Sequence, residues 1–461
     1  MKRLLIANRG EIACRIARTC RSMGIETVAV YSEADRDALH VSLCDSSVEI
    51  GPAKASDSYL NYERILGAAS ASGADAVHPG YGFLAENAEF AERVRRNGMI
   101  WIGPAPGHIK LMGDKASARA AAVEAGVPVL SGSSRLDNVE AIQAAAAPIG
   151  FPLLIKAVAG GGGIGMQRVD RIEDLGQMTT RAMGLAERAF GSREVYLERY
   201  VPVARHVEVQ ILGDGKGHAI HLFDRDCSVQ RRFQKVVEEA TAPRISERAR
   251  AAMSEAAVRL ATQIGYAGLG TVEYVYDVNS EQFYFLEMNT RIQVEHPVTE
   301  MVTRQDLVRR QLLVASGSSD AVPAQQDIGR AGHSIEARVY AEWPEKNFIP
   351  SPGAIEEFEF HADSDPHVRV DTGYRAGDRV PVFYDPLVAK VIAWDEDRDR
   401  CITRLRDHLA KVNVGGIRTN VRFLVDLLGH QSFVVADLHT GFIDAHRNAL
   451  LPAAPSNKVA G

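Results

Sequence analysis

Five polar side chains recur at every second position of one short segment, Glu287-Met-Asn-Thr-Arg-Ile-Gln-Val-Glu295. Successive side chains of an extended chain point to opposite faces, so the alternation predicts one polar and one apolar face. The polar face comprises Glu287, Asn289, Arg291, Gln293 and Glu295. The opposite face comprises Met288, Ile292 and Val294, with Thr290 as a polar exception. Charged groups near a core are costly unless partnered, which favours a site for a metal, an anion or a substrate. The alternative is a half-exposed edge strand with solvated charges.

A second carboxylate is predicted beside this row. Glu273 alternates with apolar neighbours, and the polar segment Asp277–Gln282 can turn the chain so that this strand pairs with Phe283–Asn289. Cross-strand neighbours lie about 5 Å apart, so Glu273 and Glu287 could share one face. With Asn289 they form an oxygen-rich set that suits Mg²⁺ or Mn²⁺ bridging nucleotide phosphates. Surface carboxylates that repel each other are the alternative.

Glycine and basic residues suggest two anion-binding elements. The run Gly160–Gly165, with Gly161, Gly162 and Gly163 at its centre, follows a predicted strand and precedes another. Backbone N–H groups of such a flap can close over phosphates, with Lys156 beside them; a plain glycine turn is the alternative. The segment Asp226–Lys235, which includes Gln230, is strongly cationic, and it is either a solvated face or an anion site. Arg338 lies on another alternating strand, and this pattern alone favours a structural role for it.

Composition places limits on function. The 461 residues suggest about three domains, and 46% hydrophobic with 24% charged residues is typical of globular proteins. A net charge of −6 favours neither nucleic acid nor a membrane surface as partner. The five cysteines form no CxxC pair, and we find no signal peptide or apolar span, so we expect a soluble cytoplasmic protein. Walker A, zinc-ligand, G-x-S-x-G and HExxH patterns are absent from the sequence.

Alternating strand-like and helical segments predict a Rossmann-like layer over residues 1–112. Its first turn lacks GxGxxG, which disfavours a dinucleotide site, and Asn8 is expected to cap the first helix. The expected strands are Leu4–Ala7, Thr27–Tyr31, Ser47–Ile50, Ala76–His78 and Ile100–Ile102, and the expected helices are Glu11–Met23 and Tyr62–Ser70.

Two further domains are expected beyond this layer. A central domain spans residues 113–315, with a hinged lid at about 131–203, and a mixed α/β domain spans 333–447. A Ser-, Gly- and Pro-rich linker (316–332) separates them, and a flexible tail (448–461) follows. Central helices are expected at Ala116–Ala125, Val139–Ala147 and Arg248–Ile264, and central strands at Pro152–Val158, Met166–Val169, Glu194–Tyr200, His206–Leu212, Ala219–Asp224, Gly270–Tyr276 and Phe283–Asn289.

Taken in order, these motifs resemble a biotin carboxylase of the ATP-grasp superfamily. The resemblance runs from Ile6-Ala-Asn-Arg-Gly-Glu-Ile12 to about residue 447. Its further markers are His78-Pro-Gly-Tyr-Gly-Phe-Leu84, Leu111-Met-Gly-Asp-Lys115, Lys156 with the glycine run, Arg205-His-Val-Glu-Val-Gln210, Arg225-Asp-Cys-Ser, Gln230-Arg-Arg, Gln234-Lys235 and residues 287–300. The fold implied is α/β and α+β, with a Rossmann-like N-terminal domain, a central ATP-grasp domain with a mobile lid and a C-terminal mixed α/β domain.

The resemblance also implies roles for individual residues. Lys115, Lys156 and the glycine run would contact ATP phosphates, while Glu198, Arg199, Tyr200 and Val201 would form the adenine hinge, with His206 and Gln230 nearby. The divalent metal would be held by Glu273, Glu287 and Asn289. Bicarbonate would be held by Lys235, Arg291, Gln293 and the Val294 backbone, whose exposed N–H requires regular strand pairing to end before Pro297. Glu295 would be the base that deprotonates bicarbonate, which would attack the γ-phosphate of ATP to form carboxyphosphate. Carboxyphosphate would deliver CO₂ to biotin N1, and Arg338 would stabilise the biotin enolate.

The implied activity is the first half-reaction of an acyl-CoA carboxylase. The expected holoenzyme is acetyl-CoA carboxylase of fatty-acid synthesis; propionyl-CoA, another acyl-CoA, pyruvate and urea are alternative acceptors. No lysine lies in a Met-Lys-Met context, so we expect biotin on a separate carrier protein, a separate carboxyltransferase, and a homodimer. Phe233, Ile164 and Ala159 depart from the family pattern and could alter ATP affinity or lid closure. A ligase using an amine acceptor and a silent regulatory homologue are rival interpretations.

Overall fold

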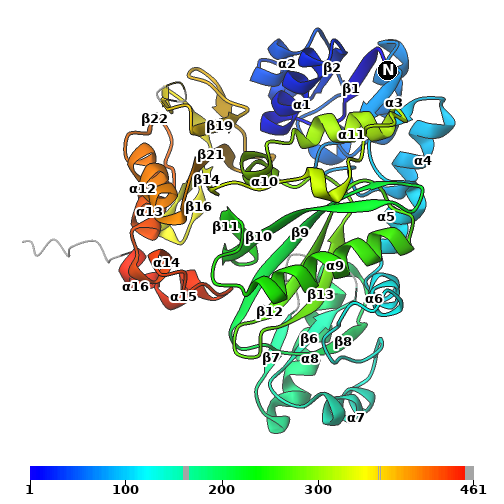
Figure 1. The fold of residues 1–461 in the computed structure, drawn as a ribbon, viewed down its shortest axis with the longest axis vertical. Helices are drawn as coiled ribbons and strands as arrows, with labels where there is room; N and C mark the ends of the chain where they lie inside the picture. Colours follow the sequence, from blue (N-terminus) through cyan, green and yellow to red (C-terminus); the bar gives the residue numbers. More distant parts are fainter. Residues whose placement is uncertain (159–165, 362, 364, 452–461) are drawn as a thin grey trace, which may run out of the picture.

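The computed structural model describes residues 1–158, 166–361, 363 and 365–451. The predicted flap glycines 161–163, the departures Ala159 and Ile164, and most of the predicted tail lie outside these residues. Figure 1 shows the N-terminal layer, the central sheet, the smaller sheet of β6–β8 and the C-terminal region as four neighbouring parts. Among the described residues, no helix combines the length and apolar composition needed to cross a bilayer.

The N-terminal layer is a five-stranded parallel sheet of order β3-β2-β1-β4-β5. Leu4 and Ile6 of β1 pack on one side with α1, and Leu5 packs on the other side with Ile65 and Phe90 of α3 and α4. The strands are β1 (Arg3–Ile6), β2 (Glu26–Tyr31), β3 (Ser46–Glu49), β4 (Ala76–His78) and β5 (Ile100–Trp101). The helices are α1 (Gly10–Ser22), α2 (Leu39–Leu43), α3 (Tyr62–Ala71), α4 (Ala88–Arg96) and α5 (Pro106–Gly113). The expected parallel layer is therefore present.

The predicted cap of the first helix was wrong. The N-cap residue of α1 is Arg9, and it makes no side-chain capping bond. Asn8 instead ties two loops together: its amide donates to the carbonyls of Pro79 and Tyr81, at 2.7 Å each, while its Oδ1 accepts from the Arg9 backbone N–H at 2.8 Å. Asn8 therefore braces the turn after β4.

The centre of the molecule is an eight-stranded antiparallel sheet of order β13-β12-β9-β10-β11-β14-β21-β19. It contains β9 (Ala204–Asp214), β10 (Ala219–Arg231), β11 (Gln234–Ala240), β12 (Ala267–Asp277), β13 (Gln282–Asn289), β14 (His333–Tyr340), β19 (Val368–Thr372) and β21 (Leu387–Asp395). Helix α9 (Glu247–Gln263) covers β9 and β10, and α6 (Lys115–Glu124) packs on β13. The strand expected at Ala219–Asp224 continues to Arg231, because a shift in register after His221 carries it into the basic segment.

The eight-stranded sheet therefore contains strands from both sides of the linker predicted at residues 316–332. Strand β11, before the linker, pairs with β14, after it, from Val237↔Ala337 to Ala240↔Ser334. Apolar residues Val236 and Val237 accordingly belong to the same buried cluster as Ile335 and Val391. Helices α10 (His296–Thr303) and α11 (Leu307–Ala315) precede the linker, and α10 lies against β10, β11, β14 and β21.

The smaller sheet is built from β6 (Leu153–Ala157), β7 (Gln167–Val169) and β8 (Val195–Arg199), in the order β7-β6-β8. Helices α7 (Val139–Ile149) and α8 (Leu175–Phe190) cover it, and Figure 1 shows it at the end of the molecule opposite the N-terminal layer. Its core of Leu153, Ile155, Val195 and Leu197 with α7 and α8 is separate from the other clusters.

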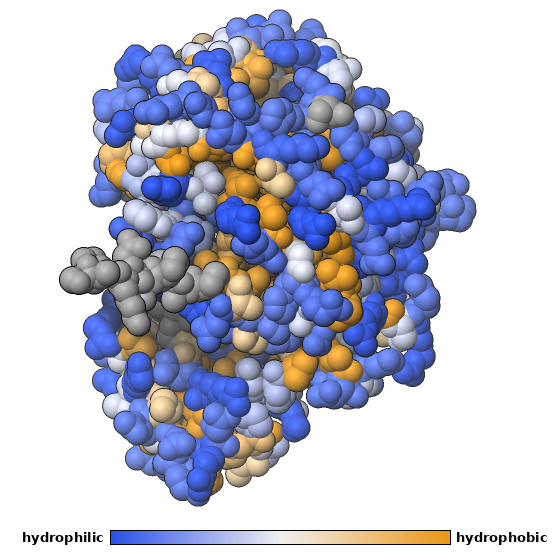
Figure 2. Space-filling view, turned by 90° about the vertical axis from the view of Figure 1, so that its left-hand side faces the viewer, coloured by the Kyte–Doolittle hydropathy of each residue, from blue (hydrophilic) through white to orange (hydrophobic). Residues whose placement is uncertain are grey.

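The remaining C-terminal elements are short strands and helices around β14 and β21. The strands are β15 (Glu342–Trp343), β16 (Ile349–Pro350), β17 (Gly353–Ala354), β18 (Glu357–Glu359), β20 (Arg379–Val380) and β22 (Asn413–Gly415). The helices are α12 (Arg398–Leu409), α13 (Val421–Leu428), α14 (Gln431–Val434), α15 (Phe442–Ala445) and α16 (Arg447–Leu450). Figure 2 views this side and shows a mostly hydrophilic surface with hydrophobic residues gathered near its middle.

Candidate active site

The two predicted carboxylates lie directly opposite each other. In the register of β12 and β13, Glu273 pairs with Glu287 and Thr271 pairs with Asn289. Glu273 is buried, and Glu287 lines the cleft described below. A register shift follows Glu273, so the next pair is Tyr274↔Phe285. Burial, and then the charge of Glu273, raise the pKa of Glu287. The pair therefore presents concentrated negative charge to the cleft.

Strand pairing stops at Asn289, and residues 290–295 form a loop before α10. The expected end of regular pairing before Pro297 is thus confirmed, but strict alternation through Glu295 is wrong. Ile292 is fully buried as expected, whereas Val294 lines the cleft instead of facing away from it. Its carbonyl accepts a 2.7 Å hydrogen bond from Lys390, which turns the loop away from a strand path.

Lys235 is the cation at the centre of the site. Its ammonium group donates to Glu208 at 2.6 Å, to Glu295 at 2.6 Å and to Glu273 at 3.1 Å. Burial lowers its pKa, but the surrounding anions outweigh burial and hold the pKa well above the ordinary lysine value. Lys235 is therefore charged, and an anion that enters the site could bind its ammonium group alongside the three carboxylates.

Glu295 is held between two cations. Lys235 contacts its Oε1, and Arg338 donates to its Oε2 at 2.9 Å. Burial favours the neutral form, but the charges of Lys235, Arg338 and Arg225 outweigh it and hold the pKa of Glu295 well below its usual range. The carboxylate is therefore ionised at neutral pH. Arg338 also forms an ion pair with Glu238, in which its Nη2 lies 2.5 Å from Glu238 Oε1.

Two polar side chains of the loop connect it to neighbouring elements. Gln293 donates to Glu273 at 2.8 Å and accepts from Arg225 at 2.6 Å. Arg291 donates to Asn289 and to Glu86, both at 2.9 Å, and Glu86 belongs to the N-terminal layer. The loop is thus fixed to the central sheet on one side and to the N-terminal layer on the other.

Sequence reasoning missed three residues that organise this site. Arg225 is fully buried and donates to Glu208 at 2.5 Å, to Gln210, Thr271 and Thr299, and to Gln293. Glu208 bridges Arg225 and Lys235, and Glu86 holds Arg291. Arg225 and Glu208 stood within motifs that carried the family resemblance, but their burial was not visible in the pattern. No local signal distinguishes Glu86 from other exposed glutamates.

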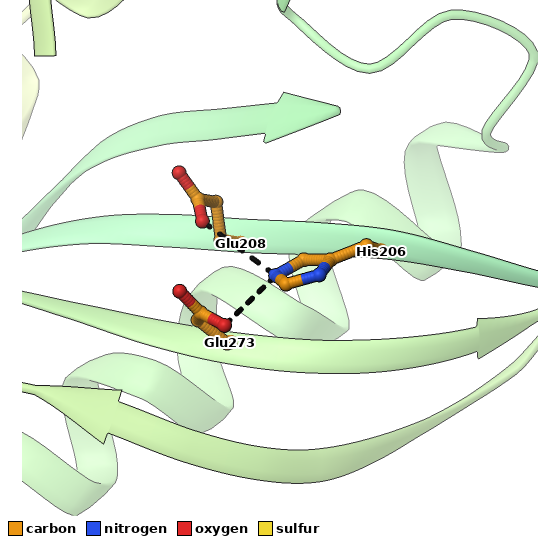
Figure 3. Close-up of side chains that lie close together, drawn as sticks. All are labelled: His206, Glu208 and Glu273. Carbon is orange, nitrogen blue, oxygen red and sulfur yellow. Dashed lines mark ion pairs between the residues drawn. The ribbon is translucent and has the colours of Figure 1, made fainter. Parts of the chain in front are cut away.

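His206 joins Glu208 on β9 and Glu273 on β12. Its Nε2 lies 2.9 Å from Glu273 and 3.7 Å from Glu208, and Figure 3 shows the imidazole pointing between the two carboxylates. Burial lowers the pKa of His206, but Glu273 outweighs burial and raises it above the ordinary value. Ligand atoms of these three residues lie within 4.8 Å of one another.

A cleft of about 1050 Å³ brings most of the predicted residues together. The predicted residues that line it are Lys115, Lys156, Glu198, His206, Gln230, Lys235, Glu273, Glu287, Asn289, Arg291, Gln293, Val294, Glu295 and Arg338. Arg199, Tyr200 and Val201 follow Glu198 but do not line the cleft. Phe233 does line it, with 59% of its surface exposed.

Two lysines enter this cleft from different elements. Lys115 begins α6, where Asp114 caps the helix by accepting from the Ser117 N–H at 2.9 Å. Lys156, on β6, forms an ion pair with Glu198 on the neighbouring strand. Burial, with a contribution from Lys156, lowers the pKa of Lys115. Both lysines thus line the cleft, and Glu287 lies near enough to Lys115 to act on its pKa in the opposite direction.

Family models match the chain over nearly its whole length. They are the biotin carboxylase N-terminal domain at residues 1–109, the carbamoyl-phosphate synthase L chain ATP-binding domain at 114–321, and the biotin carboxylase C-terminal domain at 336–445. Biotin carboxylase 1 of Bacillus subtilis is 47% identical, with 97% of this chain and 99% of that protein covered. The chain belongs to the biotin carboxylase family.

Other family members differ in length and in name. The methylcrotonoyl-CoA carboxylase subunit alpha of Dictyostelium discoideum, a mitochondrial protein, is 48% identical over 98% of this chain, which spans 65% of that subunit. The biotin carboxylase domain dimer of 2-oxoglutarate carboxylase from Hydrogenobacter thermophilus, solved with MgADP, ADP and bicarbonate, is 40% identical with a TM-score of 0.91. That match covers 97% of this chain and 98% of the solved chain. The predicted fold class is thereby confirmed.

Proposed function

We propose that this chain uses ATP and bicarbonate to carboxylate biotin, which is the first half-reaction of a biotin-dependent carboxylase. The observation that carries the proposal is the Lys235–Glu295–Arg338 group, in which an ionised carboxylate sits between two cations at the wall of the cleft. A relative with MgADP and bicarbonate bound, named above, supports the choice of substrates. Phosphoryl transfer mainly requires positioning and charge neutralisation, which this cleft can supply.

Lys115 and Lys156 are proposed to hold the phosphates of ATP, with Glu198 and the residues after it at the adenine end. The predicted hinge residues Arg199, Tyr200 and Val201 follow Glu198 in the chain and are proposed to complete this end of the nucleotide site, although they do not line the cleft. A labile carboxyphosphate requires that water be excluded from the reacting groups, which closure of the proposed lid at about 131–203 would achieve. His206 and Gln230 line the same cleft and are proposed to lie beside the nucleotide.

A divalent cation, Mg²⁺ or Mn²⁺, fits the carboxylate pair. Glu273 and Glu287 would hold it with Asn289, since hard cations prefer oxygen ligands and the two carboxylates are direct partners in the strand pair. The alternative set of His206, Glu208 and Glu273 is less suitable, because Glu208 is fully buried and does not line the cleft, whereas Glu287 does. Such an ion supplies neutralisation of phosphate charge.

Bicarbonate is proposed to bind Lys235, Arg291, Gln293 and the Val294 backbone. An anion that shares Lys235 and Arg338 with Glu295 weakens their hold on that carboxylate, so the basicity of Glu295 rises when the substrate arrives. Glu295 then accepts the bicarbonate proton, and the oxygen that loses it attacks the γ-phosphate. Arg338 remains at the cleft wall, where it can stabilise the negative charge that develops on the biotin ureido oxygen.

The carboxyl acceptor of the holoenzyme is a separate proposal. We infer an acyl-CoA acceptor, with acetyl-CoA in fatty-acid synthesis as the first candidate to assay. Named relatives at 40–48% identity carry methylcrotonoyl-CoA and 2-oxoglutarate in their names, so the assay needs these acceptors too. A carrier protein bearing biotin, a carboxyltransferase and a second copy of this chain are the proposed partners.

The test measures phosphate release from ATP with and without bicarbonate and free biotin. We expect hydrolysis that depends on bicarbonate and is stimulated by biotin, and we expect Glu295→Gln to lose at least a hundredfold, the usual contribution of a positioned base. Glu396→Gln, a change on an exposed helix-cap segment, is the matched control. Stimulation by amines in place of biotin would instead favour an amine ligase, and absence of hydrolysis in the wild type would favour a silent homologue.

A further inference from the structure

Two glutamates lie buried behind Arg338, outside the residues assigned above. Glu238 of β11 and Glu336 of β14 are direct partners in the antiparallel register, and both are fully buried. Directly opposite residues point to the same face, with Cβ atoms about 5 Å apart. Their neighbours Val237 and Ala337 belong to the C-terminal core, so the two carboxyl groups share the face that looks toward the site.

The pair has too few cationic partners for two negative charges. Arg338 contacts Glu238 at 2.5 Å and Glu295 at 2.9 Å through the same nitrogen, Nη2. Among the described residues, neither oxygen of Glu336 has a hydrogen-bond partner. Two buried carboxylates at this separation do not ionise together, because each charge opposes the other and neither is solvated.

The remaining groups that face the pair do not supply the missing charge. Among the described residues, they are Cys227 of β10, Lys235 of β11, Glu295, Tyr340 of β14 and Lys390 of β21. His296 begins α10, which packs on both β11 and β14. Lys235 is engaged by Glu208, Glu273 and Glu295, and Lys390 by Glu11 at 3.1 Å and the Val294 carbonyl. Burial holds the pKa of His296 well below its usual range, so that imidazole is neutral. The negative charge of the Glu238–Glu336 pair is therefore reduced by a proton on one of the two carboxyl groups.

The acid–base properties of the two groups agree with this geometry. Burial raises the pKa of Glu238 to about 7, although Arg338 opposes it. Burial, only partly offset by Lys390, raises the pKa of Glu336 well above the ordinary value. One carboxyl group of the pair therefore holds a proton at neutral pH, and this leaves a single negative charge toward Arg338.

We propose that Glu238 and Glu336 share this proton and position Arg338 for biotin; the inference rests on the proposed function. Glu295 loses its charge when it accepts the bicarbonate proton and then no longer attracts Arg338. Glu238 would keep the guanidinium at the cleft wall at that moment, when the biotin ureido oxygen needs it. The pair itself neither gains nor loses a proton in the cycle. Glu238 and Glu336 are thus positioning residues that act through Arg338.

Infrared difference spectroscopy of the whole chain tests the shared proton directly. We expect a buried protonated-carboxyl band at pH 7 that Glu336→Gln and Glu238→Gln each remove or shift. Glu239→Gln is the matched control: Glu239 neighbours Glu238, but Arg398 and His333 keep its pKa at about 2, so this change should remove no such band. A spectrum without this band, or a band that only the control removes, would overturn the shared proton.

Kinetics test the positioning role. Glu238→Gln is expected to raise the KM for biotin about tenfold, while bicarbonate-dependent hydrolysis without biotin changes less than twofold. At alkaline pH the wild-type pair would lose its shared proton and gain a second negative charge beside Arg338, so we expect the KM for biotin to change there. Glu336→Gln, whose side chain stays neutral at every pH, is expected to keep neutral-pH activity and to lack this alkaline change. A biotin KM unaffected by Glu238→Gln would overturn the positioning role. A wild type without biotin-dependent turnover would contradict the proposed function and this role together, while the infrared band would still decide the shared proton.

Discussion

At the residue scale, the site is a balance of buried charges rather than a set of independent groups. Lys235 compensates Glu208, Glu273 and Glu295, and Arg338 compensates Glu295 and Glu238. Removing one partner of a buried pair leaves an uncompensated charge, which costs more than the pair itself contributes. Each of these side chains therefore affects stability as well as chemistry.

Lys235→Met is expected to lower the free energy of unfolding by roughly 3 kcal/mol at pH 7, the cost of stranding buried carboxylates. Urea unfolding measures the change, and Lys216→Met, in an exposed turn, is the control. In the wild type, Lys235 lowers the pKa of Glu273 and Glu295, which stabilises the fold above the ordinary glutamate pKa. In the variant those pKa values rise. The deficit should therefore be complete above the ordinary glutamate pKa of about 4.3 and shrink as pH falls below it, toward the lowered pKa values of Glu273 and Glu295. A deficit that stays constant with pH would contradict this explanation.

At the element scale, short connections place the reactive groups. The strand pair β12–β13 carries the carboxylate pair, and the hairpin β10–β11 brings Lys235 back over Glu208. The loop after β13 depends on tethers from distant elements, since Lys390 of β21 and Glu86 of the N-terminal layer hold it. These two contacts explain how residues 290–295, which are not in a strand or helix, can hold their side chains in fixed positions at the cleft.

Lys390→Met should detach the loop at Val294. The carbonyl would lose its hydrogen bond and Glu11 would lose an ion pair, so we expect the KM for bicarbonate to rise about tenfold, equivalent to about 1.4 kcal/mol. Steady-state kinetics with varied bicarbonate measure this change, and circular dichroism checks the fold. A variant that folds and has an unchanged KM for bicarbonate would show that the Lys390–Val294 hydrogen bond does not position the loop.

The β10–β11 turn carries two non-glycine residues with positive φ, Arg232 at 49° and Phe233 at 66°. Left-handed backbone costs roughly 1 kcal/mol for such residues, and glycine avoids this cost. Because Phe233 is also largely exposed, Phe233→Gly should stabilise the chain by about 0.5–1 kcal/mol. A urea midpoint that falls would show that contacts of the Phe233 ring outweigh the backbone cost.

Local patterns predicted most elements but only part of the site. Alternation identified Glu273 and Glu287 as partners, and it failed after Asn289, where tertiary tethers replace strand geometry. Arg225 could not be identified as central because its five partners come from four separate segments. Periodicity reports which face a residue occupies, but contacts between distant segments decide which charges become buried together.

At the scale of the whole molecule, the central sheet unites parts that the sequence pattern separated. Composition marked residues 316–332 as a linker, yet β11 and β14 are adjacent on either side of it. Pairing between strands that are about a hundred residues apart leaves no local signal. The linker expected at residues 316–332 therefore lies between two strands of one sheet.

Residues 333–461 expressed alone are expected not to fold. Strand β14 would become a bare edge, and the cluster that includes Val236 and Val237 would lose its apolar partners. Chemical denaturation followed by circular dichroism measures this, and addition of residues 1–332 should restore a cooperative transition. Cooperative unfolding of the isolated fragment would show that the C-terminal part is an independent domain.

Transfer of labelled bicarbonate to biotin tests the central proposal most directly. The chain is incubated with ATP, Mg²⁺, labelled bicarbonate and a biotinylated carrier protein, and the label on the carrier is counted. We expect ATP-dependent labelling that Glu295→Gln abolishes and that Glu396→Gln leaves unchanged. ATP hydrolysis without label on biotin, or labelling that survives the loss of the Glu295 carboxylate, would contradict the function proposed for this cleft.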